Sequence, residues 1–141
     1  MRYGVAVDLG TSGYRAQKID MDTREIKRTV ITLRNPLPGA NVMDHMDFAI
    51  RYGQDLAHGL SVNAVKTLLQ TLDVPSGELD RISICGNPIQ LSIFQGITIE
   101  DLAYAGERKK KKYNIQEQTR NARIIPSSEI SGLEEFNCEV V

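Results

Sequence analysis

The alternation of apolar and polar residues predicts three short strands at the start of the chain. Strand-forming residues occupy positions 3–7, 14–20 and 25–33. A glycine-rich turn at 8–13 and a polar turn at 21–24 separate them. Strands joined by such short turns pair antiparallel, so the three should form a meander. A P-loop protein or a dinucleotide-binding protein would pass from its glycine-rich turn into a helix, and the pattern therefore disfavours both classes.

Beyond a breaker-rich loop at 35–41, the apolar residues recur at every third or fourth position. That spacing predicts a helical region, which Gly53 and Gly59 weaken. Ser61 is expected to cap a second, firmer helix that ends before Val74. The apolar positions of the two helices are Met46, Ala49, Ile50, Leu56, Ala57, Leu60, Val62, Val65, Leu68, Leu69 and Leu72.

The second half of the chain contains one more definite strand and helix. Residues 81–85 predict a short buried strand, and Asn87 with Pro88 can start the helix that follows. Residues 97–105 predict a short strand or a helical turn. Residues 107–141 are mostly charged and polar, and their pattern predicts no definite element.

Length and charge narrow the class of protein. The chain has 141 residues, enough for one compact domain and too few for two of usual size. Its formal net charge of −1 gives no general attraction to nucleic acids or membrane surfaces. No apolar stretch approaches the roughly 20 residues that span a bilayer, and the N-terminus does not resemble a signal peptide. We therefore expect a cytoplasmic protein with no nucleic-acid and no membrane partner.

The cysteines and histidines show no metal-binding spacing. Cys85 and Cys138 lie far apart and lack a Cys-x-x-Cys arrangement, so neither an iron–sulfur cluster nor a structural zinc site is predicted. Cys85 ends an apolar run, where a thiol is usually a small core side chain. His45 and His58 lie in the helical region without a matching ligand pair, and we expect them to be structural or exposed.

Asp8, Gly10, Thr11, Ser12 and Gly13 form the first candidate site. Glycines at this spacing permit unusual backbone angles, which let successive N–H groups point into one anion-binding concavity. Thr11 and Ser12 add hydroxyl donors, and Asp8 at the end of a buried strand suits Mg2+ or a metal-bound water. We expect a metal-bound phosphate here, with Asp8 as the metal-binding carboxylate. The alternative is an ordinary glycine-rich hairpin, which needs no ligand.

Gly86, Asn87 and Pro88 form the second candidate site. A strand that ends in Gly-Asn and opens a helix delivers polar side chains and free N–H groups to one crevice. From these residues alone, Asn87 is either a plain helix cap or a residue that lines this crevice.

The most basic stretch of the chain is 108–112, which includes four consecutive lysines. Tyr113 is the only aromatic ring beside it, whereas stacking platforms for single-stranded nucleic acids usually need several rings. Runs of like charge ordinarily stay in water. We therefore expect a solvated loop with no nucleic-acid role.

The turn at 8–13, between its strands, resembles the first phosphate motif of the sugar kinase, heat-shock chaperone and actin superfamily. The resemblance implies that the hairpin binds phosphates and that Asp8 before it acts catalytically through the metal. It also implies that Asn87, with Gln90 as a further candidate, lines the same nucleotide cleft and faces the turn around Gly10. Together with residues 52–55 and 85–90, the turn also resembles the opening half of the ATP-dependent reductive activators of corrinoid proteins. The longer strings at 34–45 and 101–106 resemble a member of that group found in methanogenic archaea.

The resemblance implies an α/β fold, namely a ribonuclease-H-like actin-type ATPase subdomain. Its mixed five-stranded sheet would start with the three-strand meander and be flanked by helices. The implied cofactors are ATP and Mg2+ in the full-length protein, and the implied partner is a corrinoid protein whose cobalt is reduced at the expense of ATP. The superfamily carries its second phosphate loop in a later domain, and no such glycine-rich turn follows Gly106. Residues 1–141 are thus expected to be the N-terminal ATPase subdomain, inactive without the missing second ATPase domain.

Two other classes share this fold and remain open. A small-molecule kinase would use Asn87 and Gln90 to contact a substrate hydroxyl. An actin-like assembly protein would instead form filaments with ATP.

Overall fold

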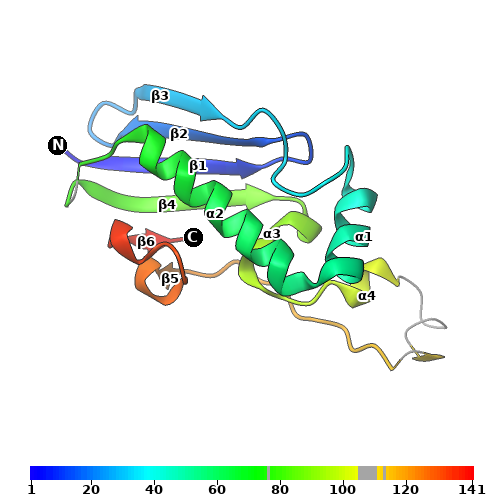
Figure 1. The fold of residues 1–141 in the computed structure, drawn as a ribbon. Helices are drawn as coiled ribbons and strands as arrows, with labels where there is room; N and C mark the ends of the chain where they lie inside the picture. The colour runs from blue at the N-terminus through cyan, green and yellow to red at the C-terminus, as the bar shows by residue number, and fades with distance from the viewer. Residues whose placement is uncertain (76, 105–110, 113) are drawn as a thin grey trace.

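The computed structural model describes residues 1–75, 77–104, 111–112 and 114–141. Within these residues the strands form one six-stranded mixed sheet, shown in Figure 1. The strands in chain order are β1 (Tyr3–Leu9), β2 (Tyr14–Asp20), β3 (Ile26–Ile31), β4 (Leu79–Gly86), β5 (Ile125–Pro126) and β6 (Glu139–Val140). Their order across the sheet is β3-β2-β1-β4-β6-β5.

The predicted three-strand meander is confirmed. β1 pairs antiparallel with β2, and β2 pairs antiparallel with β3. In β1 the side chains of Val5, Val7 and Leu9 are buried whereas Asp8 is exposed, so one face of the strand packs on the core and the other is open. β3 is an edge strand with mostly exposed side chains, and it is shorter than the predicted stretch of 25–33.

Two helices, α1 (Val42–Tyr52) and α2 (Gln54–Leu72), follow the meander. Asn41 caps α1, because its side chain accepts a hydrogen bond from the Asp44 backbone N–H at 3.0 Å. The helices are separated at Gly53, whose φ of 108° lies outside the helical region and favours glycine. The prediction that Ser61 caps the second helix is wrong, since Ser61 lies buried inside α2.

The strand–helix corner predicted around Asn87 is confirmed. β4 runs parallel to β1 and leads into α3 (Pro88–Gln95), with Pro88 at the first helical position. The Asn87 side chain accepts a hydrogen bond from the Gln90 backbone N–H at 2.9 Å. The stretch after α3 forms a short helix, α4 (Glu100–Ala103), which is the helical turn of the two predicted alternatives.

The sheet has one strand more than the five expected. β6 pairs parallel with β4 and antiparallel with β5. Each of these strands has only two residues, which is too short for an alternating pattern to be recognised in the sequence. The 3₁₀ turns η1 (Ser127–Glu129) and η2 (Glu134–Phe136) lie between them. Pro126 is tolerated in β5 because that strand lies at the edge of the sheet.

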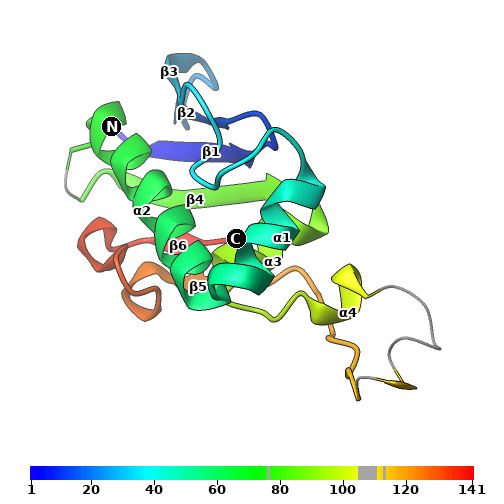
Figure 2. The same cartoon turned by 45° about the vertical axis from the view of Figure 1, so that its right-hand side comes forward.

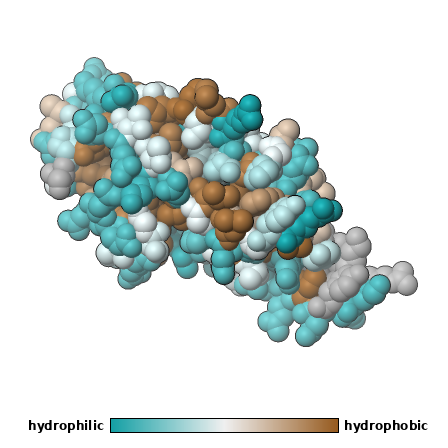
Figure 3. Space-filling view, in the orientation of Figure 1, coloured by the Kyte–Doolittle hydropathy of each residue, from teal (hydrophilic) through white to brown (hydrophobic). Residues whose placement is uncertain are grey.

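Apolar side chains form two cores, on different parts of the sheet. The larger core lies between the sheet and α2, and it includes Val7, Leu9, Val65 and Leu72. The smaller core joins α1, α2, α3 and the loop at 35–41. Figure 2 shows α1 and α3 together beyond the carboxyl ends of β1 and β4. On the face that carries α2, hydrophilic side chains surround separate apolar patches (Figure 3).

Arg120 fastens an extended segment onto α3 and α4. Its guanidinium donates to both carboxylate oxygens of Asp101, at 2.7 and 2.8 Å, and to the Ser92 hydroxyl at 2.8 Å. The Gln118 backbone N–H donates to the same carboxylate at 2.9 Å. Asp101 is buried, and these bonds lower its pKa to about 2, with the Arg120 hydrogen bond as the largest cause.

Of the predicted basic run, residues 108–110 lie outside the described residues. In the described part of the chain, no helix combines the length and the apolar character needed to cross a membrane.

Candidate functional site

The hairpin between β1 and β2 carries the first group of predicted site residues. Leu9 pairs with Tyr14, so the connection consists of Gly10, Thr11, Ser12 and Gly13. Asp8 precedes it on the exposed face of β1, and its partner in the register of β2 is Arg15. The structure thus brings the one predicted carboxylate next to the predicted phosphate turn.

The two glycines of the hairpin are required for a reason other than the predicted one. Neither Gly10 nor Gly13 has a left-handed φ, so the expected unusual backbone angles are absent there. A Cβ added at Gly10 would lie 2.7 Å from the Gly13 carbonyl oxygen, and one at Gly13 would lie 3.1 Å from the Thr32 carbonyl oxygen. Close approach of the backbone, rather than torsion, therefore excludes larger residues at Gly10, and at Gly13 a larger residue would require a small shift of the neighbouring backbone.

A buried polar network supports the hairpin from the interior. The Asn35 side-chain amide donates to the Gly10 carbonyl oxygen at 2.9 Å and to Gln90 Oε1 at 3.3 Å. Asn35 Oδ1 accepts from the Leu37 backbone N–H at 2.9 Å. Asn35 is 7% exposed, so these bonds have little competition from water.

The network continues from Gln90 to three further side chains. The Gln90 amide nitrogen lies 2.8 Å from His45 Nδ1 and must donate to it, which leaves the His45 Nε2–H to donate to the Gly39 carbonyl oxygen at 3.4 Å. The Tyr14 hydroxyl lies 2.8 Å from Ser61 Oγ and 3.5 Å from Gln90 Oε1. Burial raises the pKa of Tyr14 to about 12, so the phenol stays protonated.

Gln90 therefore lies inside the protein and not in the cleft where it was expected. Its side chain is fully buried and its carboxamide forms hydrogen bonds inside the protein, so the interpretation of Gln90 as a cleft residue is wrong for this structure.

The sequence pattern predicts the burial of some members of the network but not of others. His45 lies four residues before Ala49, and Ser61 lies between Ala57 and Val65 on one helical face. The spacing of the apolar residues therefore predicts that both side chains are buried. Asn35 lies in a loop, where no periodicity marks a buried residue.

The second candidate site lies beside the first one. In the parallel register of β1 and β4, Leu9 stands next to Gly86, so the Gly10 and Asn87 corners are neighbours. A Cβ at Gly86 would lie 3.1 Å from the Leu9 carbonyl oxygen, which explains the glycine. Asn87 is partly exposed and acts as the cap of α3.

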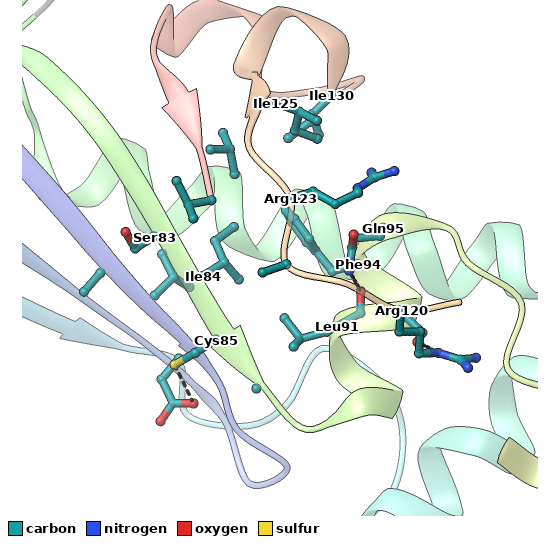
Figure 4. A pocket seen from close by; sticks show the side chains of 18 of the residues that line it. Ser83, Ile84, Cys85, Leu91, Phe94, Gln95, Arg120, Arg123, Ile125 and Ile130 are labelled. Atoms are coloured by element: carbon teal, nitrogen blue, oxygen red, sulfur yellow. Dashed lines mark hydrogen bonds between the residues drawn. The ribbon is translucent and has the colours of Figure 1, made fainter. Parts of the chain in front are cut away.

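Two cavities adjoin the hairpin. Asp8 lines one and Thr11 and Ser12 line the other, whereas Gly10, Gly13 and Asn87 line neither of the two. One, of about 650 Å³, is lined by Asp8 and Gly86 together with residues of α3 and the segment at 120–125. Figure 4 shows its wall, with Ser83, Ile84 and Cys85 on β4 opposite Leu91 and Phe94 on α3. The other, of about 640 Å³, is lined by Thr11, Ser12 and the loop at 34–40.

Cys85 is exposed in the first cavity, so the expectation of a core thiol is wrong. It lies on the open face of β4, and its Sγ is 4.0 Å from Asp8 Oδ1, the contact drawn at Cys85 in Figure 4. Partial burial raises the pKa of the thiol, and the negative charge of Asp8 raises it further. The thiol is therefore not activated as a nucleophile.

The residues present suit a magnesium ion that is held mainly by phosphate. Among the described residues, no group of three or more His, Cys, Asp or Glu side chains could enclose a metal ion. Mg2+ usually keeps several waters and takes one or two carboxylates together with substrate phosphates. Asp8, exposed at the end of β1 and beside the hairpin, fits the role of that single carboxylate.

Comparison with known proteins identifies a relative. No family model matches the chain. It is similar to a Co(II) methylated amine-specific corrinoid protein reductase of Methanosarcina barkeri, with 49% identity over 140 residues. The match covers 99% of this chain and 26% of that protein, so the chain spans about a quarter of the relative's length. The identity thus extends over nearly the whole of this chain and relates it to the matching quarter of that reductase.

A solved structure supports the fold. A reductive activator for a corrinoid, iron–sulfur protein matches with a TM-score of 0.72 and 18% identity, over 99% of this chain and 22% of that one. At this identity the likeness concerns the fold alone. It supports the predicted α/β class, and the strand order confirms a mixed sheet that begins as a meander.

Proposed function

We propose that this chain is the first phosphate-binding part of an ATPase that reductively activates a corrinoid protein. The observation that carries the proposal is the 49% identity with the corrinoid protein reductase. The hairpin at the end of β1, with Asp8 before it and Thr11 and Ser12 in it, supports a phosphate site within that matched region. The complete nucleotide site then requires a second domain, in keeping with the quarter of the relative that the chain spans.

The chemistry follows from what these residues can hold. Mg2+ bound with the nucleotide would neutralise charge on the phosphates. Asp8 would orient that metal or its waters, while the backbone N–H groups and hydroxyls of Thr11 and Ser12 bind the phosphate oxygens. Asn87 would line the same cleft at the neighbouring corner. Phosphate binding would stabilise one conformation of the domain, so the conformation would differ with and without nucleotide. Such a difference is required if ATP hydrolysis is to be coupled to the partner protein.

The partner in this proposal is a corrinoid protein whose Co(II) accepts one electron. That electron comes from outside this chain, because its two cysteines cannot supply the four thiolates of an ordinary iron–sulfur cluster. We propose a cytoplasmic member of the group linked to methanogenesis in archaea. The strings at 34–45 and 101–106 favour methanogenesis marker protein 14 as its identity.

The test is ATP hydrolysis by the full-length protein with and without a Co(II) corrinoid protein and a low-potential reductant. The expected result is hydrolysis stimulated by the corrinoid protein, with formation of Co(I) followed by its absorption spectrum. Stimulation by a small metabolite instead would show a kinase. Sedimentation of the protein with ATP would show an assembly protein.

A further inference from the structure

We propose that Asn35 is a positioning residue for the phosphate hairpin, since it fixes the Gly10–Thr11 peptide and thereby aims the Thr11 N–H at the bound phosphate. The inference rests on the proposed function of the hairpin. In this inference Asn35, a loop residue outside the hairpin, orients one of the N–H groups with which the hairpin would bind phosphate.

The argument begins with the geometry of one peptide group. The Asn35 side-chain amide donates to the Gly10 carbonyl oxygen at 2.9 Å. In a trans peptide the C=O of one residue and the N–H of the next point in opposite directions within one plane. Holding the Gly10 oxygen toward the interior therefore turns the Thr11 N–H away from the interior. Described residues of this chain include no cis peptide bond, so the relation holds here.

The Asn35 side chain is itself fixed by hydrogen bonds at both the oxygen and the nitrogen of its carboxamide. Asn35 Oδ1 accepts from the Leu37 backbone N–H at 2.9 Å, which determines which side of the amide is nitrogen. Asn35 Nδ2 also donates to Gln90 Oε1 at 3.3 Å, and Gln90 is fully buried. The side chain thus cannot turn over without breaking bonds that water would not replace. A preorganised donor stabilises charge without the cost of reorientation during the reaction.

A tertiary anchor matters here because no left-handed glycine torsion marks this hairpin: neither Gly10 nor Gly13 has a positive φ. The close contacts at the two glycines limit which side chains fit there, and they do not by themselves fix the orientation of the Gly10–Thr11 peptide. Thr11 and Ser12 line a cavity of about 640 Å³, so this side of the hairpin is not closely packed. The tertiary hydrogen bond from Asn35 supplies the missing restraint.

The decisive variant is Asn35→Asp, which has nearly the same shape. Its carboxylate still accepts from the Leu37 N–H, but it has no donor for the Gly10 oxygen. The matched control is Ser61→Ala, which breaks the same network at its far end, at the 2.8 Å contact with Tyr14, and leaves the hairpin contact intact. Both variants lose stability, so a purely structural role of Asn35 predicts the same behaviour in both.

The first measurement uses amide 15N relaxation of the 141-residue chain. We expect the Thr11 order parameter to fall from about 0.85 in the parent and Ser61→Ala to below about 0.6 in Asn35→Asp. Lowering the pH should restore the order, because a protonated carboxyl can donate to the Gly10 oxygen again. An ordered Thr11 amide in Asn35→Asp at neutral pH would overturn the inference, whatever the nucleotide does.

The second measurement is the Mg-ATP affinity of the full-length protein. We expect Asn35→Asp to weaken binding about ten-fold, the equivalent of one hydrogen bond, and Ser61→Ala to change it less than about two-fold. Equal affinities of the two variants would refute the positioning role. A parent protein that binds no ATP would refute the proposed function instead, while the relaxation result would still decide whether Asn35 holds the hairpin.

Discussion

The carboxylate of Asp8 and the carboxamide of Asn35 serve the same hairpin in different ways. Asp8 is exposed beside the hairpin, where the proposed metal would lie, whereas Asn35 is buried and bonded to the hairpin backbone. An exposed carboxylate at the end of a strand contributes little to folding, because it has no buried bond to lose. Its replacement should therefore act on chemistry rather than on stability.

We expect Asp8→Ala in the full-length protein to abolish ATP hydrolysis while much of the nucleotide affinity remains. The removed metal contact is strongest as charge develops in the transition state, so turnover suffers more than binding. Thr11→Ala should be milder, since backbone donors remain. Turnover and affinity are measured at saturating Mg2+, and wild-type turnover by Asp8→Ala would show that the metal role is wrong.

Asp101 makes the stability of the protein depend on pH in acid. Its pKa is about 2 in the folded chain and 3.8 in its usual state. Because the folded pKa is the lower one, the Arg120 pair stabilises fully above 3.8, and this contribution is lost as pH falls through about 2. We expect Asp101→Asn to lower the unfolding free energy by about 2 kcal/mol at pH 7 and by much less at pH 2.

Urea denaturation of Asp101→Asn and the parent across this range checks the prediction. Glu129→Gln, at an exposed residue of η1, removes the same charge without touching the pair and serves as control. A gap between parent and Asp101→Asn that does not narrow in acid would contradict the assignment.

At the scale of elements, the corner between β4 and α3 combines a structural role with a proposed functional one. Asn87 caps α3 through the 2.9 Å bond from the Gln90 N–H, and the register places this corner next to Gly10. A cap alone is worth about 1 kcal/mol and is largely recovered by serine. The two roles can therefore be separated by a single substitution.

We expect Asn87→Ser to keep the melting temperature near that of the parent and to lose partner-stimulated ATP turnover in the full-length protein. Serine caps the helix but is shorter than asparagine, so it would lose the contact that the proposed cleft role of Asn87 requires. Thermal unfolding and ATP hydrolysis are measured on the same preparation. Parent-like behaviour in both assays would leave Asn87 as a helix cap only.

At the scale of the whole molecule, the proposed function makes the hairpin and the corner beside it one part of a nucleotide site. The chain matches 26% of its relative's length, and the superfamily resemblance places the adenine pocket and the second phosphate loop in a later domain. Phosphate contacts alone give weak affinity, because the nucleotide loses its freedom without burying its base.

The chain by itself should accordingly fold, bind Mg-ATP more weakly than micromolar, and release no phosphate. Calorimetric titration with Mg-ATP and a phosphate-release assay check this expectation. The full-length protein is the positive control in both assays. Micromolar affinity with multiple turnovers by the chain alone would show that its site is complete.

Local sequence determined much of this fold. The meander, the loop at 35–41, the cap at Asn87 and the α/β class follow from alternation, spacing and capping, which act over a few neighbouring residues. The position of the helix break was misread, because Gly53 and Ser61 are both reasonable boundaries until packing buries one of them. The two-residue strands β5 and β6 could not be predicted from the sequence, since the pairing of β6 with β4 and of β5 with β6 depends on backbone that is distant in sequence.

The surroundings of the candidate site depended on tertiary structure. Asp8 and the hairpin stand out in the sequence because their chemistry and spacing are local. The burial of Gln90, the exposure of Cys85 and the bond from Asn35 to Gly10 join residues between 25 and 77 positions apart, as the contacts of Asn35 with Gly10 and of Cys85 with Asp8 show. Such contacts form only when the sheet, α1, α2 and α3 have come together, because a loop polar residue has no periodic neighbours that predict its partner.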